Sequence, residues 1–201
     1  MKNQNPIAEI IESSTKSIIV QCYELYQAPK LGTLIKTQDD PSIIGIVYNV
    51  FTEPLDPSRR PIARGPFQNE PEKLYEENPH LSLLFRTQAQ IFILGHVDQM
   101  NSYSYELPLL PAKIHTGICL LNQEEVASFT KTRAFLELLI EGLDIITDEI
   151  FSISIRRISG YHSDPEKFLY DTGKDVANNF PHDQQKLISL LRKLGRGPIN
   201  E

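Results

Sequence analysis

The sequence predicts an α+β protein in which a small N-terminal antiparallel β-barrel is followed by a C-terminal helical segment. Short runs of β-branched residues, separated by turn residues, fill the first part of the chain, and apolar residues at helical spacing begin after Asn122. The 201 residues are 40% hydrophobic and 23% charged, as is ordinary for a globular protein. We therefore expect a barrel domain at residues 1–121, with a helical insertion near 70–85, and a helical domain at 122–201.

The most informative predicted strand is residues 42–51. Its apolar residues occupy both sets of alternating positions, so both faces are expected to be buried, as in the central strand of a closed barrel. Gly45 interrupts this strand. A lone glycine within a strand usually marks a bulge or a close backbone approach, and small barrels need such bends to close. We therefore expect a bulge at Gly45.

The other β elements follow from similar signals along the chain. We expect strands at residues 7–12, 17–23, 33–37 and 87–97, an extended segment at 107–114 and a closing strand at 115–120. A Pro-rich loop is expected at 53–66, because proline cannot sit in a central ladder. A short helix at 70–77 and a helical turn at 81–85 are expected before the strand at 87–97, and a polar loop at 99–106 after it.

Helix signals dominate residues 122–195. Asn122 is expected to cap a helix, and Gly142 is expected to divide the apolar run that follows. Asp164-Pro165-Glu166 combines a cap, a proline and an acid, and so predicts another helix start. A final amphipathic helix is expected at 184–194. Any stripe of these helices that stays exposed would indicate an interface.

Charge and cysteine content restrict the class of protein. The formal net charge of −6 at pH 7 disfavours a protein whose affinity comes mainly from nucleic-acid phosphates. Cys22 and Cys119 are far apart and form no CxxC pattern, so reduced core thiols are expected rather than a disulfide. The N-terminus is polar and no apolar run approaches a membrane-spanning length, so we expect a cytoplasmic protein without a membrane span.

No metal site, cofactor or catalytic constellation is predicted. The histidines show no HExxH-type spacing. Strand alternation would allow a site formed by His96, His115 and Cys119, but buried structural His and Cys are far commoner. The tripeptide His162-Ser163-Asp164 resembles a catalytic triad only in print, because neighbouring residues cannot adopt that geometry, and we expect it to be a helix cap.

The candidate binding residues are Arg59, Arg60 and Arg64 in the Pro-rich loop. Three guanidinium groups on a stiffened loop are suited to gripping phosphate or carboxylate, although a solvated loop is the commoner explanation. A second basic patch would draw on cations of the helical half: Arg156, Arg157, Arg192, Lys193 and Arg196. The alternative is that these charges only complement helix dipoles.

Several segments of the first half resemble the HAS barrel. This is the N-terminal β-barrel shared by HerA-type DNA-translocating ATPases and the ATP synthase catalytic core. The similar segments are IAEII (7–11), LGTLIK (31–36) and IGIV (44–47), with Gly95 and LPLLPA (107–112) similar to the end of that barrel. The resemblance covers roughly residues 1–120. As a whole the chain resembles stand-alone HAS-barrel proteins of cyanobacteria.

The chain departs from the motor proteins of that family in one respect. Their ATPase core needs a P-loop of the form GxxxxGK[ST]. Here Gly173-Lys174 is followed by Asp175, and Phe168 stands in place of the first glycine, so the motor is absent. The resemblance then implies the barrel's other role, which is packing side by side in rings and docking partners.

We therefore expect a non-catalytic protein-interaction or assembly module, with a protein partner or self-association. The alternative is an accessory protein that binds single-stranded nucleic acid through the barrel and the Arg59–Arg64 loop. The net charge disfavours that alternative.

Overall fold

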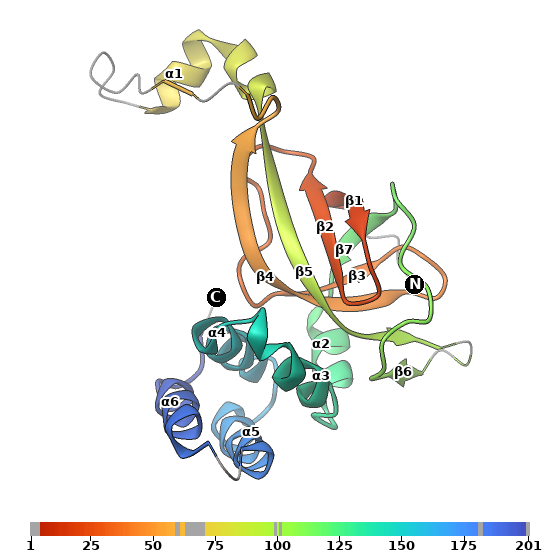
Figure 1. The fold of residues 1–201 in the computed structure, drawn as a ribbon, viewed down its shortest axis with the longest axis vertical. Coiled ribbons are helices and arrows are strands. Elements are labelled where there is room, and N and C mark those ends of the chain that lie inside the picture. Colours follow the sequence, from red (N-terminus) through yellow and green to blue (C-terminus); the bar gives the residue numbers. More distant parts are fainter. Residues whose placement is uncertain are drawn as a thin grey trace.

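A computed structural model of the chain describes residues 5–58, 61–62, 71–98, 100, 102–180 and 183–199. Within these residues a closed, six-stranded antiparallel barrel is joined to a group of helices, which confirms the predicted α+β fold (Figure 1). The strands are β1 (Ala8–Ser13), β2 (Ser17–Cys22), β3 (Leu34–Thr37), β4 (Ile43–Pro54), β5 (Phe85–Val97), β6 (Tyr103–Ser104) and β7 (Gly117–Leu120). The helices are α1 (Pro71–Glu77), α2 (Gln123–Thr130), α3 (Phe135–Glu141), α4 (Asp148–Ser159), α5 (Pro165–Asn179) and α6 (Gln184–Leu194), with 3-10 turns η2 (Pro79–Leu84) and η3 (Gly142–Asp144).

The barrel closes where β2 pairs with β5. Around the barrel the order is β2, β1, β7, β3, β4 and β5, and β6 extends the sheet beside β5. The predicted closing strand is therefore present as β7, and it lies between β1 and β3. Residues 107–114 form no strand, and the predicted polar loop at 99–106 includes the two residues of β6.

β4 is the central strand that the sequence predicts. It pairs with both β3 and β5, and its residues from Ile43 to Val47 are all buried. The pairing register shifts between Ile44 and Gly45, so the predicted bulge is present. A Cβ atom on Gly45 would lie 2.5 Å from Ile91 Cγ2. The barrel interior therefore has no room for a side chain at this position.

The β4–β5 ribbon is longer than the sequence predicts, and Figure 1 shows it rising beyond the barrel with α1 near its tip. β4 continues to Pro54 and β5 begins at Phe85, so the ladder takes in residues expected to form the Pro-rich loop and the helical turn. Glu53 Oε1 accepts a hydrogen bond of 2.6 Å from Arg86 Nη2. Cross-strand pairs of this kind stabilise the ribbon, and Pro54 is tolerated because it ends the strand.

Two hydrophobic cores lie on opposite faces of β4 and β5. The barrel core contains Ile43, Val47, Ile91 and Ile93. The second core contains the outward-facing residues Ile44, Ile46, Phe92 and Leu94, packed with helical residues such as Phe135, Leu139, Phe151 and Ile155. The helical group α2 to α6 is therefore built onto the outer wall of the barrel. The predicted domain boundary between residues 121 and 122 stays a prediction.

The helix starts follow the predicted caps. Asn122 and Glu125 form a capping box at α2, and Asp164 accepts a hydrogen bond of 2.9 Å from Lys167 N at α5. Gly142 ends α3 and begins η3, as expected. A side-chain cap at Thr147 begins α4, which the sequence did not single out.

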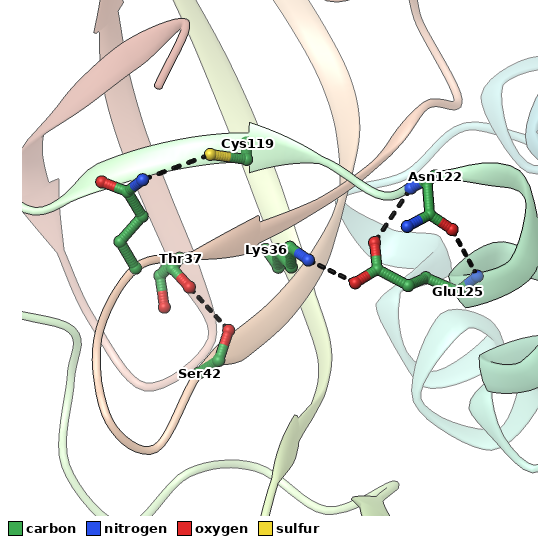
Figure 2. Close-up of polar contacts among 7 residues, drawn as sticks. Lys36, Thr37, Ser42, Cys119, Asn122 and Glu125 are labelled. Carbon is green, nitrogen blue, oxygen red and sulfur yellow. Dashed lines mark hydrogen bonds and ion pairs between the residues drawn. The ribbon is translucent and has the colours of Figure 1, made fainter. Parts of the chain in front are cut away.

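Polar contacts tie α2 to the barrel (Figure 2). Lys36 of β3 forms an ion pair with Glu125, whose other carboxylate oxygen accepts a hydrogen bond of 2.9 Å from Asn122 N. Glu125 therefore serves both the capping box and the barrel. Gln38 directly follows β3, and its Nε2 lies 3.5 Å from the sulfur of Cys119, which is buried on the neighbouring strand β7. These contacts fix the point where the chain leaves the barrel.

The helices approach the barrel closely at two glycines. Gly32 has φ +76°, and a Cβ atom there would lie 2.8 Å from Ser154 Cα in α4. A Cβ atom on Gly142 would lie 2.6 Å from the ring of Phe92. Because α4 lies against the backbone at Gly32, this turn sets the spacing between the barrel and the helices.

We expect Gly32→Ala to lower the free energy of unfolding by about 2 kcal/mol or more, since it adds both left-handed strain and a backbone clash. Gly197→Ala is the matched control. Gly197 has φ +80°, but a Cβ atom there meets nothing within 4 Å. Its cost should be limited to about 1 kcal/mol of conformational strain. Urea unfolding followed by circular dichroism measures both; equal losses would show that the Gly32–Ser154 approach is not tight.

Candidate protein-interaction surface

The predicted binding residues Arg59, Arg60 and Arg64 lie outside the described residues. Their binding role therefore stays a prediction.

Four of the five cations in the second predicted patch are held by other groups of the chain, and the fifth, Arg192, is exposed. Arg157 is buried and its Nη2 donates a hydrogen bond of 3.3 Å to Thr33 Oγ1. Lys193 and Arg196 both pair with Glu149. Arg156 Nε donates to the carbonyl of Gly197, and Arg156 O accepts from Ile199 N at 3.1 Å. These contacts hold the segment after α6 against α4.

The structure does not bring His96, His115 and Cys119 into a metal site. His115 precedes β7 and has φ +69°, so the strand alternation that placed it on one face with Cys119 was wrong. Its Nδ1 instead pairs with Glu9, while His96 Nδ1 lies 3.2 Å from the carbonyl of Glu106. In the part of the chain that the structure describes, no three His, Cys, Asp or Glu side chains are grouped to hold a metal ion.

Within the helical group formed by α2 to α6, α5 and α6 lie furthest from the barrel (Figure 1). Their inner faces belong to the core through Phe168 and Val176 of α5 and Leu190 and Leu194 of α6. Asp164 and Asp183 cap their N-termini through hydrogen bonds to backbone N–H groups. Both helices are therefore fixed in position by packing on one side and by capping at the start.

An open groove of about 590 Å³ lies between α5, the end of α6 and the segment that follows it. It is lined by Glu166, Leu169, Tyr170, Gly173, Lys174, Ala177, Leu191, Leu194, Gly195, Gly197 and Pro198. Most of these side chains are apolar, and the volume falls in the range typical of ligand and peptide pockets. The same Arg156 contacts that hold residues 197–199 also fix one wall of the groove.

Small residues keep the groove open on the α5 side. Gly173 and Ala177 are four residues apart, so they lie on one face of α5. A Cβ atom on Gly173 would approach Leu191 Cδ2 to 3.2 Å. Tyr170 on α5 is 64% exposed, as is Ile188, which lies one turn before Leu191 on α6. Apolar side chains are thus exposed along both helices.

The charged groups of the groove stand at separate positions along α5. Glu166 and Lys174 are eight residues apart, roughly 12 Å along the helix axis. Lys174 Nζ lies 4.2 Å from the centre of the Tyr170 ring, which is the geometry of a cation–π contact. The groove therefore has an acidic group near the start of α5, a basic group about two turns later and an apolar floor.

A second cavity, of about 370 Å³, lies where the barrel meets α2 and is lined partly by carboxylates. Most of these already have structural partners. Asp39 accepts hydrogen bonds from Lys113 N and Thr116 Oγ1, and Asp98 accepts from two backbone N–H groups of its own turn. Glu125 belongs to the capping box. We therefore regard the α5–α6 groove as the stronger candidate site.

Comparison of the chain with known protein families and with curated proteins finds no match. No helix among the described residues combines the length and apolar character needed to cross a membrane.

His162 lies next to α5, and the structure gives it a packing role. Its Nε2 is 2.8 Å from Thr130 Oγ1, and its ring stacks on Phe168 with centres 4.1 Å apart. Asp164 caps α5, so the His162-Ser163-Asp164 tripeptide forms the predicted cap. Burial lowers the pKa of His162, and the nearby charge of Arg133 acts in the same direction.

We expect this histidine to make the fold sensitive to mild acid. Its lowered pKa means that the unfolded chain takes up the proton first, so the contribution is intact above about pH 6.5 and is lost as the pH falls below that value. His162→Gln should therefore lose less stability than the wild type between pH 7 and pH 5. Thermal unfolding of both proteins across this pH range tests the expectation. His80→Gln is the control for removing one histidine, because His80 in η2 is exposed. Parallel pH profiles for wild type and His162→Gln would contradict the expectation.

Proposed function

We propose that this protein is a non-catalytic protein-interaction module that docks a partner in the α5–α6 groove. The observation that carries the proposal is the groove itself, open and apolar between two helices that the core holds in place. Grooves between helices commonly receive apolar side chains of a helix or an extended peptide. Because the walls are fixed before binding, little ordering entropy is lost when a partner docks.

The chemistry of the groove supports binding over catalysis. Among the described residues, its charged lining groups are Glu166 and Lys174, and this part of the lining includes no histidine, cysteine or serine. The thiols lie elsewhere: Cys22 and Cys119 are both buried, and burial raises the pKa of each. A raised thiol pKa disfavours the nucleophilic thiolate. We therefore infer a docking role for the groove.

The closed barrel supports, but does not by itself identify, a relation to HAS barrels. We propose that the barrel serves as the platform that carries the helices and their groove. The alternative function, single-stranded nucleic-acid binding, stays a prediction, because Arg59, Arg60 and Arg64 lie outside the described residues.

We expect a photoreactive phenylalanine analogue in place of Ile188 to form a discrete protein adduct when the chain is expressed in its native cells. The same analogue at Lys16, on the β1–β2 turn, should not form that adduct. Leu191→Asp should remove the adduct, since a carboxylate in the apolar groove opposes docking. Gel shift and mass spectrometry of the adduct give the readout.

Leu83→Asp is the matched control for that change. Leu83 is an exposed leucine on η2, which directly follows α1, and α1 lies at the opposite end of the molecule from α5 and α6 (Figure 1). The same change there should therefore leave the adduct intact. No adduct at position 188, or an adduct that survives Leu191→Asp, would overturn the proposed function.

A further inference from the structure

Two leucines stand out from the loop between β6 and β7. Leu109 is 96% exposed and Leu110 is 78% exposed. Prolines flank them, since Pro108 comes before and Pro111 after. Prolines restrict the backbone before any partner arrives, so little further entropy is lost when the leucines bind.

The loop is anchored on both sides of these leucines. Leu107 packs against the barrel core, Pro108 is buried, and Ala112 is part of that core. Lys113 N donates a hydrogen bond of 3.1 Å to Asp39 Oδ2. Leu109 and Leu110 therefore project into solvent from a braced loop. We call residues 106–113 the leucine strip.

Residues of opposite charge lie at the two ends of the leucine strip. Glu106 and Lys113 are both exposed, and the contacts found for them use their backbone atoms. Along the strip, an acidic residue is therefore followed by an exposed apolar pair and then by a basic residue. The groove offers the complement, because its apolar floor lies between Glu166 and Lys174. A strip running antiparallel to α5 places Glu106 toward Lys174 and Lys113 toward Glu166.

We propose that the occupant of the α5–α6 groove is the leucine strip of a second copy of this chain. This inference rests on the proposed function and names its partner. Leu109 and Leu110 enter the apolar floor, and the two charge pairs set the direction of the strip. Electrostatic matching of this kind fixes register and speeds encounter more than it adds affinity.

A single copy cannot fill its own groove with this strip. Figure 1 shows the β6–β7 loop running beside β1, while α5 and α6 lie at the far side of the helical group. The contact is therefore heterologous: each copy offers one strip and one groove, and assembly continues from copy to copy unless the rotation closes a ring. A contact this small belongs with weak, transient interfaces, so association depends on concentration.

Light scattering with analytical ultracentrifugation tests the pairing. The wild-type mass should rise above 22.9 kDa as the concentration increases to several hundred micromolar. The strip variant Leu109→Asp/Leu110→Asp and the groove variant Leu191→Asp should each stay monomeric. An equimolar mixture of the two variants should form a dimer and stop there, because one intact strip and one intact groove remain. Leu83→Asp should associate like the wild type.

Charge reversal gives an independent readout of direction. Glu106→Lys should weaken self-association roughly three- to ten-fold, and adding Lys174→Glu in the same chain should recover most of that loss. A wild type that stays monomeric, a strip variant that associates normally, or a mixture that stays monomeric would overturn the inference.

The two proposals fail in different ways. If the analogue at position 188 captures a different protein while the purified chain stays monomeric, the self-docking inference falls and the proposed function stands. If position 188 captures nothing, the proposed function falls as well.

Discussion

β4 and β5 are buried on both faces, and each supplies side chains to two separate cores. Ile43 and Val47 point into the barrel, whereas Ile44 and Ile46 point toward the helices. A strand in this position cannot slip by one residue, because slippage would exchange the two sets. The same constraint explains why position 45 is a glycine, because Ile91 fills the space into which a side chain there would point. The helices must therefore pack against outward-facing barrel side chains whose positions are already fixed.

That match explains how the helical group is layered. The ring of Phe92 in β5 lies against Gly142 at the end of α3, and α4 lies against the backbone at Gly32. α3 and α4 therefore pack directly on the barrel. α5 and α6 pack against α4 in turn and use only their inner faces for the core. Their outer sides have no further layer among the described residues. An apolar groove between them is therefore a surface that the fold leaves open.

Local signals in the sequence were enough to predict most elements. Asn122, Gly142 and Asp164 act within one turn of their own position, so their roles could be identified without knowledge of the fold. Pairings between distant segments could not: the insertion of β7 between β1 and β3 and the extension of β4 to Pro54 both depend on tertiary partners. The left-handed conformation of His115 likewise comes from its place at a turn, which strand alternation could not indicate.

The candidate site was beyond sequence reasoning for a similar reason. Gly173-Lys174 entered the prediction only as an incomplete P-loop, although the structure places both residues in the groove. A glycine inside a helix costs about 1 kcal/mol relative to alanine. At position 173 a methyl group would press on Leu191, so the glycine leaves space between α5 and α6 that a larger residue would fill. Gly173 therefore lowers the stability of the helix slightly and leaves the space that forms the groove floor. For this reason we prefer the groove as the candidate site over the cavity beside α2, whose carboxylates mostly have hydrogen-bond partners already.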